Sequence, residues 1–330
     1  MRNNRFLQLT IILFILFAST MPNITSSVNP PSTLRTVHSM IENQIDLTGI
    51  RVGIYEGYSR SEASRTALIS MFEWMNATVN VFNSTDIING SLWSCELFAI
   101  PEGLGPTLES MLTADGLQAI REWVAAGGSY IGVRGSAAMA VRYSYFEGSN
   151  TEFNLALIDG TSYEMTELEP LEMTSVSINR ACAGPDLSEM PSNLSVLFQT
   201  GRYILPGEGQ ELIFIANYTH ADLPAMVASY YGEGTVFISS PHFEYEEDSD
   251  RDGTTYYDRY DDPDSEWPFM LTIARWLIES SPTVCNITEW PYTLSTTLEE
   301  NLNFPFEILL VTGGVGIAVI LVIAIYVRRR

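Results

Sequence analysis

The chain has no lysine, and all 17 of its basic residues are arginine, against 40 aspartate and glutamate residues. It therefore offers no lysine for a Schiff base, a phosphate-binding P-loop or general-base chemistry. The net charge of −23 has the wrong sign for a nucleic-acid-binding surface and argues against nucleic acid as a partner. The simplest interpretation of the acidic excess is a solvated surface.

Histidine and cysteine are scarce, with three residues of each. The histidines are His38, His220 and His242. Three are too few for a histidine-rich catalytic metal site. The cysteines allow at most one internal disulfide, and the sequence leaves its pairing open. Cys182–Cys285 is favoured, because Cys95 borders an apolar segment and is typical of a small buried side chain.

Apolar segments lie near both ends of the chain. Residues 1–21 combine arginines, a short apolar run and small residues, which predicts a signal peptide. Residues 308–327 form an uncharged, mostly apolar run of 20 positions, which is long enough for a transmembrane helix. The three arginines at 328–330 predict a cytoplasmic tail. We therefore expect a single-pass type I protein of the cell membrane, with its N-terminal domain extracellular.

Between these segments the sequence predicts one ectodomain, residues 47–280. A proline-containing linker (22–46) precedes it and a stalk (281–307) follows it. Seven Asn-x-Ser/Thr sequons favour an exported glycoprotein, although a Ser/Thr-rich chain also produces this short pattern by chance. The sequons begin at Asn23, Asn76, Asn83, Asn89, Asn193, Asn217 and Asn286.

The first half of the ectodomain alternates between strand and helix patterns. Apolar runs predict buried strands at residues 50–55, 79–82 and 97–100. Helical patterns follow Ser61 and Thr113, which are plausible N-caps, and a last helix is expected at 267–278. This alternation predicts an α/β, flavodoxin-like fold, with a parallel sheet and helices on both of its faces.

The second half of the ectodomain changes character. Short β-rich runs separated by turn signals predict an antiparallel extension of the domain. The runs lie at residues 154–158, 174–178, 196–198 and 212–216.

Residues 127–140 form the most informative stretch of the sequence. They predict a helix end, a short strand over 130–133, a sharp turn at Arg134 and a small-residue helix from Gly135. Small residues two positions before and after the turn are typical of a nucleophile elbow. The residue at the turn also lies at a helix N-terminus, where unpaired N–H groups favour negative charge.

This elbow resembles that of the class I glutamine amidotransferase-like superfamily, and most of all domains similar to the biotin-protein ligase N-terminal domain. Residues 231–244 are similar to the family's Gly-x-Gly-x-Val strand and the His-x-Glu after it, with His242 and Glu244. Residues 97–103 stand where the family has its oxyanion turn. The resemblance implies a triad with a cysteine nucleophile, but Arg134 occupies that position. Thiolate attack then has no atom to perform it.

The resemblance and the strand ends together predict a ligand site. The carboxyl ends of parallel strands meet at one edge of a sheet, so the residues that follow them are expected to converge. The expected ligand-binding residues are Tyr55, Glu56, Glu102, Gly103, Arg134, Gly135 and Ser136. Arg134 suits a carboxylate or another anion, carried by a small molecule or a surface partner. In the alternative, Glu102 or Glu244 neutralises Arg134, because a buried unpaired arginine would be too costly.

A second hypothesis is a hydrolase. Here Ser136 is the nucleophile, His242 the base and Glu244 the group that orients it. Ser136 lies two positions beyond the expected turn, where small residues usually serve packing.

A third hypothesis is a calcium-dependent structural or adhesion protein. Asp248, Asp250 and Asp252, followed by Gly253, match the first half of a calcium loop. The second half does not match, because Arg259 stands where the loop needs glutamate. Calcium is therefore the candidate cofactor, and a merely solvated acidic loop is the alternative.

Overall fold

The computed structural model describes residues 46–246, 250–262 and 264–281. The predicted signal peptide, nearly all of the linker and stalk, the predicted transmembrane segment 308–327 and the tail lie outside the described residues. No helix within the described part is both long and apolar enough to cross a membrane.

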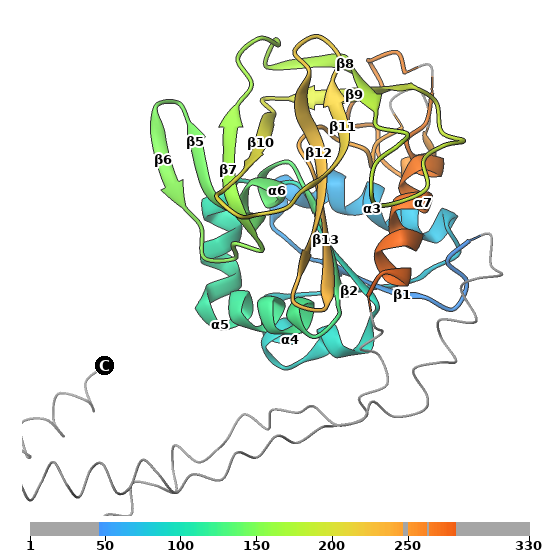
Figure 1. Ribbon diagram of the computed structural model, residues 1–330. Coiled ribbons are helices and arrows are strands. Elements are labelled where there is room, and N and C mark those ends of the chain that lie inside the picture. Colours follow the sequence, from blue (N-terminus) through green and yellow to red (C-terminus); the bar gives the residue numbers. More distant parts are fainter. Residues whose placement is uncertain (1–45, 247–249, 263, 282–330) are drawn as a thin grey trace, which may run out of the picture. The chain divides into compact units, whose positions relative to one another are not determined.

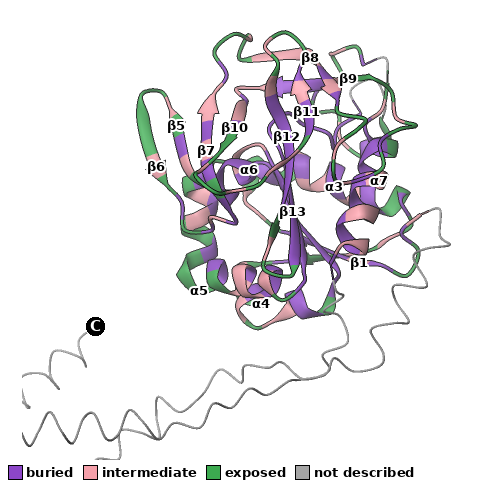
Figure 2. Ribbon diagram, viewed as in Figure 1, coloured by how far each residue is buried: buried purple, intermediate pink, exposed green. Residues whose placement is uncertain are grey.

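Five parallel strands form one half of the main sheet. They are β1 (Arg51–Tyr55), β2 (Thr78–Phe82), β3 (Leu97–Ile100), β4 (Ser129–Val133) and β13 (Gly234–Ser239). Their order in the sheet is β2-β1-β3-β4-β13. Every residue of β3, β4 and β13 is buried, as expected for strands covered on both faces (Figure 2).

Four antiparallel strands continue the same sheet beyond β13. They are β12 (Leu223–Tyr231), β11 (Ile213–Tyr218), β8 (Leu171–Ile178) and β9 (Asn193–Gln199). The order runs β13-β12-β11-β8-β9. The predicted β-rich extension therefore lengthens the parallel sheet itself.

Helices cover both faces of the parallel half, as predicted (Figure 1). On one face lie α3 (Glu62–Trp74) and α7 (Trp267–Glu279), joined by the rings of Trp74 and Trp267 at 5.7 Å. On the other lie α4 (Ser84–Ile88) and α5 (Gly105–Ala125), where Trp123 packs edge-on against Phe98 of β3. Short 3-10 turns are η1 (Ser59–Ser61), η2 (Ser91–Ser94) and η3 (Asp250–Asp252).

A second, smaller sheet follows the short helix α6 (Gly135–Ala140). Its strands, in spatial order, are β10 (Arg202–Pro206), β7 (Ile158–Glu164), β5 (Val141–Phe146) and β6 (Ser149–Glu152). The pair β5–β7 is parallel, so the region is not purely antiparallel as expected.

Three details of the expected elements need correction. The strand expected at 154–158 is wrong, because this segment is irregular and β7 begins at Ile158. Ser61 is at the N-cap position of α3, but its side chain makes no capping hydrogen bond. Thr113 does mark a helix boundary, because its non-helical φ of 63° and ψ of 168° divide α5 into two helices, but the first of these already starts at Gly105.

Candidate functional site

The elbow at Arg134 has the predicted strand–turn–helix form. Strand β4 ends at Val133, α6 begins at Gly135, and Arg134 between them has φ 53° and ψ −105°. Few non-glycine residues adopt such a conformation, and its cost must be met by the surrounding packing. Gly135 approaches the neighbouring turn so closely that a Cβ atom there would lie 1.6 Å from the Gly103 carbonyl oxygen.

The Arg134 guanidinium is held on three sides. Nη1 donates to Glu102 Oε2 at 3.0 Å, Nε donates to the Gln199 carbonyl at 2.7 Å, and Nη2 donates to Thr200 Oγ1 at 2.6 Å. Its side chain is 21% exposed, and that of Glu102 only 6%. Glu102 is thus the predicted acidic partner, and it neutralises Arg134 within the protein.

The Glu102 carboxylate also faces His242. Its Oε2 atom lies 3.5 Å from His242 Nε2, so one oxygen is shared between the imidazole and the guanidinium. On the other side of the ring, Nδ1 lies 2.9 Å from Glu244 Oε1. His242 and Glu244 are buried, and the imidazole is placed between two carboxylates. We call Glu102, Arg134, His242 and Glu244 the charge cluster.

Ser64 links the charge cluster to helix α3. Its hydroxyl accepts from the Glu102 backbone N–H at 3.0 Å and donates to Glu244 Oε1 at 2.6 Å. Burial alone would raise the pKa of Glu244. The positive charge and hydrogen bond of His242 and the hydrogen bond from the Ser64 hydroxyl outweigh this effect, so the pKa of Glu244 lies below its usual value. Sequence reasoning missed Ser64, since nothing local marks a serine in an amphipathic helix as a partner of residues so distant in the chain.

The proposed nucleophile Ser136 is not placed for attack. Its buried hydroxyl accepts from the Val133 N–H at 2.7 Å and lies within hydrogen-bond distance of the Ile100 and Val133 carbonyls. These bonds tie the elbow to β3. Among the described residues, His242 Nε2 meets only Gln199 Oε1 at 3.3 Å and Glu102.

Two of the residues expected to converge do not join the charge cluster. The Tyr55 hydroxyl lies 2.9 Å from Ser84 Oγ at the start of α4, on the opposite face of the sheet from α3. Glu56 is exposed, and its backbone carbonyl accepts from Arg65. The Tyr55 hydroxyl thus contacts α4 and not the charge cluster, and the ligand-binding role of Tyr55 and Glu56 stays a prediction.

Tyrosine rings surround His242. The ring centroids of Tyr245 and Tyr257 lie 5.0 and 6.1 Å from that of His242, and Tyr256 contacts both tyrosines. The hydroxyls of Tyr245 and Tyr257 are buried and meet no hydrogen-bond partner among the described residues. Burial, followed by the nearby carboxylates, raises the pKa of both tyrosines, so they remain neutral donors.

Two cavities adjoin Arg134 on different sides. One of about 740 Å³ is bounded by Tyr58, Glu62, Glu102 and Tyr256. The other, of about 360 Å³, is shaped by the second sheet and contains Arg202. Gly103, Leu104 and Arg134 line both, so Arg134 is the member of the charge cluster that borders both cavities.

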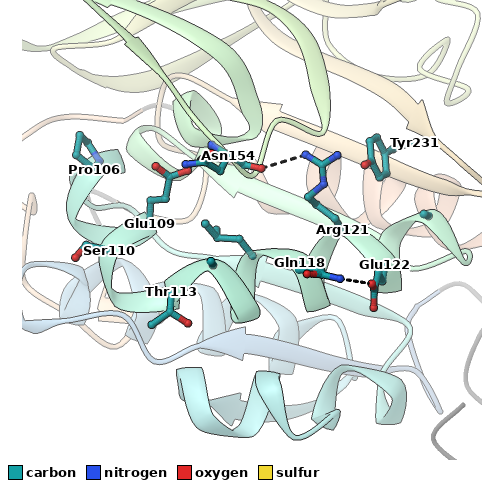
Figure 3. A pocket seen from close by; sticks show the side chains of 12 residues that line it. Pro106, Glu109, Ser110, Thr113, Gln118, Arg121, Glu122, Asn154 and Tyr231 are labelled. Carbon is teal, nitrogen blue, oxygen red and sulfur yellow. Dashed lines mark hydrogen bonds between the residues drawn. The ribbon is translucent and has the colours of Figure 1, made fainter. Parts of the chain in front are cut away.

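Another groove, of about 850 Å³, lies along α5 (Figure 3). Its polar side chains are engaged with their surroundings: Arg121 donates to the Asn154 carbonyl, and Gln118 donates to Glu122. The groove contains no member of the charge cluster. We therefore place the candidate site at Arg134, beside the other residues of the charge cluster, and not in this groove.

Two of the three predicted calcium residues, Asp250 and Asp252, lie among the described residues. Asp248 lies outside the described residues, and Asp250 is exposed. The buried Asp252 carboxylate accepts from the Glu246 and Thr254 backbone N–H groups, so it serves the turn. Burial is the largest cause that raises the pKa of Asp252, to about 6.

Carboxylates that do gather lie a short way downstream. Oxygens of Asp262, Asp264 and Glu266 lie within 4.8 Å of one another, a spacing that a cation could bridge. Asp264 also accepts from the Ser195 N–H at 3.1 Å. Acidic residues at every second position, from Asp262 to Glu266, could have indicated this cluster in the sequence. The calcium loop was predicted at residues 248–252 instead.

The described residues contain no disulfide. Cys95 is fully buried, as expected, and its thiol donates to the Leu92 carbonyl at 3.2 Å. Burial raises the pKa of that thiol. The favoured Cys182–Cys285 pair stays a prediction, because Cys285 lies outside the described residues.

The described residues thus form an α/β domain with buried charges at the carboxyl edge of its parallel strands. No protein-family profile and no curated protein matches the chain. Solved structures with a similar arrangement include a glutamine amidotransferase, at 16% identity over 62% of this chain and 96% of that chain, with a TM-score of 0.46. They also include a glutamine amidotransferase from Thermotoga maritima, at 13% identity over 70% and 95%, with a TM-score of 0.44.

A putative ThuA-like protein from Bacteroides uniformis is similar at 9% identity over 71% of this chain and 93% of that chain, with a TM-score of 0.46. These values are too low to assign a family or an activity. The function must therefore be argued from the site.

Proposed function

We propose that this chain is a non-catalytic, ligand-binding member of the class I glutamine amidotransferase-like superfamily. In this proposal Arg134 stands at the position of the nucleophile, and residues 308–327 anchor the domain on the extracellular side of the cell membrane. The ligand is an anionic small molecule or a surface partner. The relation to biotin-protein ligase N-terminal domains belongs to the same proposal and is supported by the elbow and the His-x-Glu motif.

One observation carries the proposal: Glu102 Oε2 is shared between Arg134 Nη1 and His242 Nε2. In a His-based triad the ring nitrogen that faces the nucleophile must be available to take its proton. Here a carboxylate and the Gln199 amide occupy that side of the ring. In this proposal the retained His242–Glu244 pair stabilises the site, since no hydroxyl or thiol of the described residues is hydrogen-bonded to His242 Nε2.

The rigid ion pair between Arg134 and Glu102 also favours ligand binding over covalent chemistry. A salt bridge at the apex of a strained turn fixes the backbone of Gly103 and Gly135, which line the smaller cavity. Such a rigid frame lowers the entropic cost of holding a ligand. Arg134 and Glu102 are formally neutral as a pair, so they contribute polarity to the larger cavity and no net charge.

The test is an assay for turnover on the purified full chain. We expect no ammonia release from glutamine, no hydrolysis of activated esters and no labelling of Ser136 by a fluorophosphonate. The variants Ser136→Ala and His242→Asn serve as matched controls. Amide or ester hydrolysis that both depends on this pocket and disappears in His242→Asn would overturn the proposal in favour of the hydrolase.

A calcium-dependent surface role is the second candidate function. The observation that favours it is the proximity of Asp262, Asp264 and Glu266. Calcium titration of the full chain, read as a rise in melting temperature, tests it against Asp264→Asn. If calcium raises the melting temperature of the wild type and of Asp264→Asn equally, or raises neither, this calcium site is rejected.

A further inference from the structure

Arg202 is the arginine that adjoins the charge cluster from the second sheet. It is the first residue of β10, and its guanidinium lies over the Phe146 ring, 4.5 Å from the centroid. Nη1 donates to the Ser144 hydroxyl. The side chain is half-buried and lines the cavity of about 360 Å³. A cation is therefore held in a fixed position at the wall of an enclosed space.

Arg202 lacks the ion pair that two other arginines of this region make. Arg134 pairs with Glu102, and Arg142 on β5, which lies beyond β7 in the same sheet, pairs with Asp159 at 3.5 Å. Among the described residues, no carboxylate lies within 4 Å of the Arg202 guanidinium. A partly buried cation without an ion pair is unfavourable, because water no longer solvates it fully. The acidic residue opposite it in the sheet, Glu164 of β7, makes no ion pair with it.

The titration behaviour of Arg202 agrees with this geometry. Burial is the largest cause that lowers its pKa, to about 10, and the positive charge of Arg134 lowers it further. Glu164, the residue opposite Arg202 in the β10–β7 pair, acts in the opposite direction, and its carboxylate accepts from the Glu147 N–H. Arg202 remains protonated at neutral pH, so the cavity wall stays positive.

The rest of the wall suits an oxyanion. Hydroxyl side chains that can donate hydrogen bonds come from Ser144, Ser149, Thr151 and Thr200. Phe146 forms an apolar side, and Glu147 is the one acidic residue among those lining the cavity. The volume is larger than a lone phosphate or carboxylate needs, so the charged group would be one end of a small molecule.

We propose that this cavity binds a small oxyanion, a carboxylate or phosphate group, with Arg202 as its counter-charge. The inference rests on the proposed binding function and locates the anion on the second-sheet side of Arg134. Arg134 stays paired with Glu102 and borders the anion without being its main partner. The ligand of the domain then carries one negative end toward Arg202 and polar groups toward the elbow.

The probes are inorganic phosphate and acetate, titrated calorimetrically into the purified full chain at constant ionic strength. We expect at least one of them to bind the wild-type chain, and Arg202→Gln to weaken it by about tenfold or more, since charge-assisted contacts of this kind dominate oxyanion recognition. Binding of phosphate but not acetate would identify the ligand group as a phosphate, and binding of acetate but not phosphate would identify it as a carboxylate. Arg202→Lys keeps the charge and should retain most of the affinity.

Arg142→Gln is the matched control, because it removes an exposed arginine from β5 of the same sheet. It should bind both anions as the wild type does. Equal affinity in wild type and Arg202→Gln would overturn the inference, as would no binding of either anion to the wild type. Both results leave the proposed function standing, because that is judged by the absence of turnover.

Discussion

At the scale of single residues, Glu102 is the group on which the site depends. One oxygen of its buried carboxylate faces both a guanidinium and an imidazole, and its backbone N–H is anchored by Ser64. Ion pairs at exposed positions contribute little, whereas removing one member of a buried pair leaves an uncompensated charge. The consequences of substituting Glu102 should therefore be large for a single residue.

We predict that Glu102→Gln lowers the free energy of unfolding by about 2 kcal/mol, because Arg134 and His242 lose their shared counter-charge. Urea unfolding followed by tryptophan fluorescence measures the loss. Glu279→Gln is the control, because its pair with Arg275 is partly exposed and spans 3.4 Å on one helix. That change should cost less than about 0.5 kcal/mol. Equal losses in the two variants would contradict the prediction.

Asp252 gives a pH dependence of known sign. Its pKa is raised from 3.8 to about 6 in the folded chain, so between these values the folded state binds more protons than the unfolded state. The contribution of Asp252 to stability is then greatest below about pH 4 and declines as the pH rises to about 6. We predict that Asp252→Asn removes this decline.

The measurement is the melting temperature of both proteins across this pH range. Asp250→Asn controls for the removal of one negative charge from the same turn, since Asp250 is exposed. A curve for Asp252→Asn that keeps the wild-type slope would show that other groups cause the decline.

At the scale of elements, the break in α5 stores strain. Thr113 has φ 63° and ψ 168°, a region that almost only glycine occupies at low cost. The residue is exposed and lines the groove of Figure 3. We predict that Thr113→Gly raises the free energy of unfolding by about 1 kcal/mol, the strain relieved exceeding the added entropy of the unfolded chain.

The matched control for Thr113→Gly is Gln118→Gly in the same helix. At this helical position glycine should lower stability by about 1 kcal/mol. Chemical denaturation of both variants gives the two signs. A loss of stability in both would mean that Thr113 is not strained.

The elements that sequence patterns predict well are those that a buried apolar run defines. β3 is wholly apolar and ends before Pro101, β4 is mostly apolar and follows Gly127 and Gly128, and the elbow at Arg134 follows from the small residues around it. β6 (Ser149–Glu152) could not be predicted, because its residues are polar and mostly exposed. Strands of that kind depend on pairing with a neighbour, which no local pattern records.

The same limit applies to the candidate site. The elbow motif and the His-x-Glu motif were enough to predict that Arg134, His242 and Glu244 lie close together. The partners supplied by Gln199, at the end of β9, and by Ser64, in α3, depend on how distant segments are brought together. Tyr55 shows the converse, since a strand end at the expected edge can direct its side chain to the opposite face.

At the scale of the whole molecule, an ectodomain outside the cell should carry glycans where its surface allows them. Among the sequons in the described residues, Asn89 is exposed at the end of α4. Asn217 is half-buried within β11, and its amide donates to Asp222 Oδ1 at 2.9 Å. A bulky glycan on Asn217 would break that bond and crowd the sheet, whereas one on Asn89 would extend into solvent.

We therefore predict that the full chain, expressed through a eukaryotic secretory pathway, carries a glycan on Asn89 and none on Asn217. Peptide mass spectrometry after deglycosylation reads both sites. Asn89→Gln should lower the mass of the intact chain by one glycan, and Asn217→Gln should leave the glycan content unchanged. An unmodified Asn89 in a chain that reaches the cell surface would contradict the surface argument. A chain without any glycan that stays inside the cell would contradict the proposed extracellular location, because glycans are added only to segments that enter the secretory lumen.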